Sequence, residues 1–157
     1  MTPTGVRGII EAHLQAEEES PLLQKDIAAR IAKAERYLKT AKLALDEGDY
    51  DSCVSRAYYA VFHACIALLV CYVDKGAADW KHLTIINNSI SAFAKRRKWF
   101  VHLKDTSGSK SFAESLHNLR LAREDADYGV DVITKSRSQS ALRFAGRFLQ
   151  EAKRRLK

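Results

Sequence analysis

Proline and glycine are both scarce in this sequence. Its 157 residues include two prolines, Pro3 and Pro21, and seven glycines. Sandwiches and barrels of β-strands need many tight turns, so this scarcity argues against an all-β fold and favours long helices. The apolar share of 46% and the charged share of 29% exclude a disordered or collagen-like chain. A chain of this length is enough for one domain with its own core.

Cysteine is also infrequent, and its pattern excludes two classes of small protein. The three residues are Cys53, Cys65 and Cys71, an odd number without a C-x-x-C pair. This pattern gives neither a disulfide framework nor a zinc knuckle, so we expect small core residues in a reducing, cytoplasmic compartment. We expect no signal peptide, because the N-terminus, MTPTGVRGII, has no apolar segment of the kind that such a peptide needs. We expect no membrane helix, because the longest apolar run, 57–73, is interrupted by His63.

The sequence carries no recognisable metal or phosphate-loop motif. Its five histidines are far apart, and no H-E-x-x-H occurs. Glu114 and His117 form one Glu-x-x-His pair, whereas a di-iron bundle needs two. There is also no glycine-rich phosphate loop, and we therefore expect no metal and no cofactor.

Apolar residues at helical spacing predict an all-α fold, an antiparallel up-and-down helical bundle. One stripe predicts a helix over 23–47 that ends at Gly48, with Asp49 capping the next helix. The stripe consists of Ile27, Ile31, Ala34, Leu38, Ala41 and Leu45. The helix over 50–74 has almost no polar face and should be the buried central helix.

Three further helices are predicted, over 80–98, 111–125 and 136–155. Asp79 and Ser111 should cap the first two, and 105–110 should form a loop. The stripe of the helix over 80–98 consists of Leu83, Ile86, Ile90 and Phe93. Residues 1–20 form an N-terminal extension, which we expect to add a short helix before Pro21, and residues 21–157 form the bundle.

The net charge of +7 is concentrated at the C-terminal end. Residues 134–157 contain eight basic side chains and one acid, and eight minus one accounts for the whole excess. A second basic cluster occupies 95–98. A basic segment on an otherwise balanced chain indicates an acidic partner, with nucleic acid the first candidate. The alternative is a terminal helix whose charge only keeps the protein soluble.

A polar face on the predicted central helix holds the best candidates for chemistry. Arg56 and His63 are seven residues apart, so both point the same way, roughly 10.5 Å apart along the axis. Ser52 and Tyr59 share that face. An arginine there must meet a carboxylate, a phosphate or water. In the structural alternative, Arg56 pairs with an acid of another helix, and His63 is a satisfied core histidine.

The segment 44–69, ALDEGDYDSCVSRAYYAVFHACIALL, resembles the signature of the HEPN domain (higher eukaryotes and prokaryotes nucleotide-binding). It is most similar to the short stand-alone prokaryotic members. The strings GDYD at 48–51 and SRAYYAVFHA at 55–64 are its most specific parts. His82 and the element Arg123-x-x-Ala126-Asp127-Tyr128 follow in the order those members show. The resemblance extends over about 26–156 and leaves the N-terminal extension outside it.

This resemblance implies a bundle of about five helices that often forms a homodimer. Many HEPN proteins are metal-independent ribonucleases in which a histidine follows an arginine after four to six residues. Others are toxins encoded beside a minimal nucleotidyltransferase antitoxin, and others are nucleotide-binding or scaffold modules. Ala57 here follows the arginine where the family usually has a polar residue, and the pair lies in the central helix.

Carried onto this sequence, the resemblance makes Arg56 and His63 the candidate catalytic pair. A histidine can move the proton of a 2′-hydroxyl, and an arginine can hold a phosphate, without a metal. The candidate nucleotide- or RNA-binding residues are Tyr59, Arg123, Arg143, Arg147, Arg154 and Arg155. The expected partners are a second copy, RNA or a nucleotide, and a nucleotidyltransferase-family protein. The alternative is a non-catalytic interaction or scaffold module in which the Arg/His face is structural.

The basic C-terminal helix generates the first testable prediction. Changing Arg143, Arg147, Arg154 and Arg155 together to Gln should weaken RNA binding and flatten its dependence on salt, because each phosphate contact releases counterions. Anisotropy titrations of a labelled RNA at several salt concentrations would measure both effects. An unchanged slope would show that the charge belongs only to a solvated face.

Overall fold

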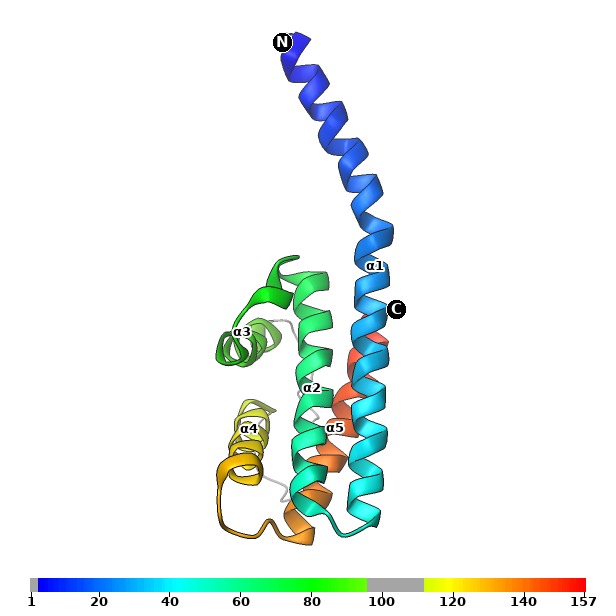
Figure 1. Cartoon of the computed structure of the whole chain (residues 1–157). Helices are drawn as coiled ribbons and strands as arrows, with labels where there is room; N and C mark the ends of the chain where they lie inside the picture. Colours follow the sequence, from blue (N-terminus) through cyan, green and yellow to red (C-terminus); the bar gives the residue numbers. More distant parts are fainter. Residues whose placement is uncertain (1–2, 96–111) are drawn as a thin grey trace.

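The computed structural model describes residues 3–95 and 112–157, and within this part of the chain every element is helical. Figure 1 shows α1 and α5 on one side of α2, with α3 and α4 on the other. The all-α helical bundle is therefore confirmed. The elements are α1 (Pro3–Asp46), α2 (Tyr50–Tyr72), the short 3₁₀ helix η1 (Ala77–Asp79), α3 (His82–Lys95), α4 (Phe112–Tyr128) and α5 (Lys135–Arg155).

The α2 helix is the centre of the bundle, as its apolar sequence predicts. It packs against α1, α3, α4, α5 and η1, and 15 of its 23 residues are buried. By length and composition α2 could cross a membrane, but 83% of its apolar window is buried inside the molecule. The other helices of one chain therefore cover most of the apolar surface of α2. The homodimer stays a prediction.

The N-terminal region differs from the expectation of a short separate helix. A single helix, α1, runs from Pro3 to Asp46 with Pro21 inside it. A proline inside a helix removes one backbone hydrogen bond and favours a bend rather than a complete break. Figure 1 shows α1 bending where it extends beyond the rest of the bundle. Of the predicted stripe, Ile27, Ala34 and Ala41 are buried.

The corner between α1 and α2 forms as predicted. Gly48 adopts a left-handed conformation with φ of 78°, which a side chain would make costly. The Asp49 carboxylate then accepts a hydrogen bond of 3.2 Å from the Ser52 backbone N–H and caps α2. This corner sets the antiparallel register in which α1 lies along α2.

The ends of the other helices differ from the prediction in detail. Asp79 lies inside η1 and does not cap α3, because Trp80 is extended and separates the two elements. The α4 helix continues to Tyr128 and ends where a Cβ at Gly129 would lie 2.6 Å from the Asp125 carbonyl oxygen. Thr134 caps α5. The predicted Ser111 cap, the loop at 105–110 and the basic residues 96–98 lie outside the described residues.

Phenylalanine side chains join α3, α4 and α5 beside α2. The rings of Phe93, Phe112 and Phe148 have centroids 5.9 to 6.5 Å apart, and Phe144 stacks on the same group. Phe93 and Phe148 are fully buried. Of the remaining stripe on α3, Ile86 is buried, whereas the side chains of Leu83 and Ile90 lie outside the described residues.

Two of the cysteines are core residues. Burial raises the pKa of Cys53 to about 11 and that of Cys65 to about 12, so both thiols stay protonated. Cys71 is half-buried, and none of the three forms a disulfide. Packing therefore accounts for Cys53 and Cys65 without a chemical role.

The cap of α2 generates the second prediction. Asp49→Ala should lower the free energy of unfolding by about 1 kcal/mol, because the Ser52 N–H loses its partner. Asp49→Asn keeps an acceptor at the cap and should lie much closer to the wild type. Urea denaturation of the three proteins checks this, and equal stability of the Ala and Asn variants would contradict it.

Candidate functional site: a pocket between α1, α2 and α4

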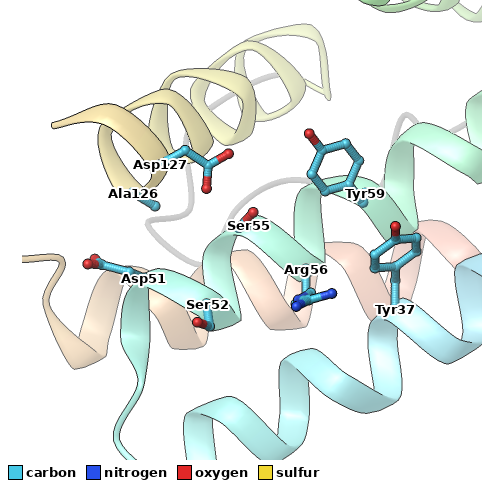
Figure 2. Close-up of a pocket in the computed structure, with 8 residues that line it drawn as sticks. All are labelled: Tyr37, Asp51, Ser52, Ser55, Arg56, Tyr59, Ala126 and Asp127. Atoms are coloured by element: carbon cyan, nitrogen blue, oxygen red, sulfur yellow. The ribbon is translucent and has the colours of Figure 1, made fainter.

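A cavity of about 380 Å³ opens where α1, the first half of α2 and the end of α4 meet. Figure 2 shows its lining: a tyrosine from α1, a row of polar residues from α2, and two residues from α4. We call it the aromatic pocket. It is lined by Tyr37, Asp51, Ser52, Ser55, Arg56, Tyr59, Ala126 and Asp127.

The polar face of α2 forms one wall of this pocket. Ser52, Arg56 and Tyr59 follow one another at spacings of four and three, so they share one side of the helix. The structure thus brings together three of the four residues assigned to that face. The fourth, His63, lies one turn beyond Tyr59 and does not line the pocket.

Arg56 is exposed, and its guanidinium lies 6.0 Å from the centre of the Tyr37 ring. Asp51 and Asp127 line the same cavity, yet no described carboxylate forms an ion pair with Arg56. Arg56 is thus open to solvent and has no described carboxylate partner. Its charge and its bidentate donors are therefore available to a ligand.

His63 has the opposite environment. It is only 6% exposed, and its ring stacks on Tyr37 with centroids 5.5 Å apart. Its Nδ1 lies 3.1 Å from Nη1 of Arg30, and an arginine can only donate, so Nδ1 accepts this bond and the neutral ring carries its proton on Nε2. Burial, followed by the nearby charges of Lys33, Arg30 and His82, lowers the pKa of His63 to about 4.

Arg56 and His63 therefore contact the same tyrosine but do not face the same space. One side chain is open to solvent, and the other is buried and hydrogen-bonded to α1. A general acid or base must reach the proton that it transfers and titrate near the working pH. His63 meets neither condition within this single chain, although Arg56 meets the requirements of a phosphate contact.

Arg123 lies beside the aromatic pocket and is engaged inside the molecule. Its guanidinium is 4.9 Å from the centre of the Tyr58 ring and 3.6 Å from the Asp127 carboxylate, and its side chain is 12% exposed. Arg123 and Asp127 are four residues apart, so this ion pair lies within α4. The contact with Tyr58 joins α4 to α2, and the ion pair leaves Asp127 less able to neutralise Arg56.

The four α5 arginines lie outside the pocket lining. Arg143 and Arg147 are exposed on α5. Arg154 and Arg155 both bond to the carboxylate of Glu151, which is only 3% exposed, at 3.2 and 2.9 Å. Part of the basic charge in this helix therefore balances a buried acid, and the assignment of these arginines to RNA binding stays a prediction.

Tyr37 and Arg30 were not predicted as parts of the site. Both lie on α1, seven residues apart, beside its apolar stripe. In the sequence alone, a tyrosine and an arginine in such positions indicate only the partly exposed side of an amphipathic helix. His82 is a further neighbour, with its ring 6.1 Å from that of Tyr59. Partial burial and the charge of Arg123 lower the pKa of His82 as well. Among the described residues no cluster of potential metal ligands occurs, and the absence of a metal stays a prediction.

Comparison with known proteins identifies the family. The model of the HEPN domain matches residues 27–156, which is most of the chain and includes every side chain of the aromatic pocket. The chain belongs to the HEPN domain family. The match begins within α1, so the first part of that helix lies outside the matched residues.

Two curated relatives have similar lengths. A "UPF0332 protein" of Archaeoglobus fulgidus is 32% identical over 129 residues, covering 82% of this chain and 93% of the relative. A protein of Methanocaldococcus jannaschii named "Putative toxin MJ0605" is 30% identical over 135 residues, covering 86% and 92%. Both alignments cover more than four-fifths of this chain and more than nine-tenths of the relative.

The buried histidine of this HEPN domain generates a pH prediction. Its pKa is about 4 in the folded protein and near 6.5 when unfolded, so between these values the unfolded chain binds more protons. The free energy of unfolding should therefore fall as the pH falls from 6.5 towards 4. The contribution of His63 to that loss should reach about 3 kcal/mol.

His63→Asn, which has no titratable group, should lose less stability than the wild type over the same pH interval. Urea denaturation of both proteins across that interval measures the two slopes, and their difference isolates this one histidine. Parallel slopes would show that His63 titrates normally in the folded protein.

Proposed function

We propose that this HEPN protein binds RNA by holding one nucleotide unit in the aromatic pocket, with Arg56 on the phosphate. The observation that carries the proposal is the Arg56 guanidinium, which is exposed, lies beside Tyr37 and has no described carboxylate paired with it. Proteins commonly bind single-stranded nucleic acid with a guanidinium group that contacts phosphate and aromatic rings on which bases stack.

The rest of the lining suits a ribonucleotide. Tyr37 and Tyr59 offer ring faces on which a base can stack, with their own centroids 5.6 Å apart. Ser52 and Ser55 can donate to or accept from a sugar, and the Asp51 carboxylate can accept from a 2′-hydroxyl. A cavity of about 380 Å³ has room for one such unit.

The position of His63 favours binding over cleavage by an Arg56–His63 pair. His63 is buried, neutral and hydrogen-bonded to Arg30, so in this proposal it supports the site and does not transfer a proton. This agrees with the interpretation of the Arg/His face as partly structural. Metal-independent cleavage is the competing outcome, and the cleavage assay below separates the two.

The biological setting follows from the family and is part of the proposal. One relative carries the word toxin in its name, and we infer a toxin-type role for this chain. A homodimer, a minimal nucleotidyltransferase antitoxin as partner and a cytoplasmic location complete the proposal. Inhibition of growth on expression, relieved by such a partner, would support this setting.

Arg56→Gln tests the binding proposal directly. It should weaken the binding of a single-stranded RNA about tenfold or more, because a charge-assisted contact to phosphate is lost. Lys39→Gln removes the same charge from an exposed position on α1 outside the pocket and should change the affinity little. Fluorescence anisotropy with a labelled RNA gives both values, and equal affinities of the two variants would refute the assignment of Arg56.

A cleavage assay completes the test. Wild type and His63→Ala should cleave a mixed RNA pool equally little, with EDTA present in both reactions. Cleavage by the wild type that is lost in a folded His63→Ala would establish a metal-independent ribonuclease instead. The melting temperature of the variant, measured in parallel, shows whether it is folded.

A further inference from the structure

A second cavity, of about 390 Å³, lies between α1, the second half of α2 and η1. Four cationic side chains line it, Arg30, Lys33, Arg36 and Lys75, against the single carboxylate of Asp26. Its apolar surface includes Ile27 and Val70, which are 5% and 7% exposed. We call it the basic pocket. It combines excess positive charge with an apolar floor, a combination suited to an anion with an apolar body.

The two pockets lie along one groove between α1 and α2. Six residues of α2 follow this line: Ser52, Arg56 and Tyr59 are among those that line the aromatic pocket, Ala67 and Val70 line the basic pocket, and His63 lies between them. Their spacings of 4, 3, 4, 4 and 3 place all six on one side of the helix. Tyr59 and Ala67 are about 12 Å apart along the axis, a span that a short nucleotide strand can bridge.

The α1 side of the groove shows the same continuity. Tyr37 lines the aromatic pocket, whereas Lys33, Arg30 and Asp26 line the basic one. Their spacings of 4, 3 and 4 keep them on one side of α1. His63 stands between the pockets, stacked on Tyr37 of one and bonded to Arg30 of the other.

His63 restricts the direction in which Arg30 points. One donor of the Arg30 guanidinium is bound to the His63 Nδ1 at 3.1 Å, and the other donors are not used by any described carboxylate. A histidine can take this role only as a neutral acceptor. The bond therefore preorganises a planar cation at the wall of the basic pocket, without neutralising it as a carboxylate would.

Lys33 and Arg36 supply further charge at the same wall. Neither forms an ion pair with a described carboxylate, in contrast to Lys153, which bonds to Glu35 at 2.7 Å. Three cations of α1, Arg30, Lys33 and Arg36, thus line one cavity within less than two turns of the helix. Among the described acids only Asp26 lines it. Mutual repulsion of these cations is relieved when an anion binds between them.

We infer that the basic pocket binds a phosphate of an RNA strand whose neighbouring nucleotide occupies the aromatic pocket, and that His63 is the positioning residue of Arg30. This inference rests on the proposed function and adds a second phosphate contact, in the basic pocket. A ligand that makes both contacts must be an RNA strand and not a free nucleotide. The α1–α2 groove is then one binding path with a phosphate contact at each end.

The double variant Lys33→Gln/Arg36→Gln tests the basic pocket. A single-stranded RNA of about eight nucleotides should bind about tenfold more weakly, and the slope of log affinity against log salt should fall in magnitude by about one. Uridine monophosphate serves as the probe for a free nucleotide. It should bind more weakly than the oligonucleotide, and its affinity should respond to Arg56→Gln but not to the double variant.

The outcomes separate the inference from the proposed function. If Arg56→Gln weakens RNA binding and the double variant does not, the basic pocket is refuted and the aromatic pocket stands. If only the double variant weakens binding, the basic pocket stands and the role of Arg56 fails. An oligonucleotide that binds no tighter than uridine monophosphate overturns the strand path. Lys39→Gln is the charge-matched control on α1.

The positioning role of His63 requires variants with and without an acceptor. The side-chain oxygen of His63→Asn can accept from Arg30, whereas His63→Leu cannot. Asn should retain most of the RNA affinity, and Leu should lose several-fold, although Leu keeps more apolar volume in the core. Equal affinities in the two variants would refute the role. Arg30→Lys, at a half-buried position, provides a second measurement and should also weaken binding because the planar fork is lost.

Discussion

The α2 helix has to be covered on nearly every side, because 15 of its 23 residues are buried. The rest of the fold follows from this requirement. The α1 and α5 helices cover one side, and α3, α4 and η1 cover the other, so a single chain removes the apolar surface of α2 from water. Ser52, Arg56, Tyr59 and His63 share one face of α2 and lie in the groove beside α1.

That groove explains why an arginine and a histidine on one helix face have different chemistry. The seven-residue separation places both on the α1 side of α2. Tyr37 contacts both side chains, and Arg56 stays exposed, whereas His63 is buried and hydrogen-bonded to Arg30. In this chain the seven-residue spacing therefore gives a hydrogen-bonded core histidine and an exposed arginine.

The local rules of helix formation predicted much of the fold. Gly48 and Asp49 placed the corner between α1 and α2 correctly, because a left-handed glycine and a capping carboxylate act within a few residues. Pro21 was interpreted as a helix boundary, yet α1 continues through it, since one missing hydrogen bond in a long helix costs less than ending it. Asp79 was predicted to cap α3. It lies in η1 instead, because the extended Trp80 separates it from the start of α3.

The sequence by itself determined the helical class, the central helix and the family, because periodicity and the segment 44–69 are properties of neighbouring residues. It also placed Ser52, Arg56, Tyr59 and His63 on one face. Only the tertiary structure decided which of them meets solvent. Burial, the Arg30–His63 bond and the joining of Asp127 to the pocket each depend on helices that are distant in sequence. The exposure of a side chain and the charges around it depend on every element packed against it, so they cannot be predicted from the sequence of one helix.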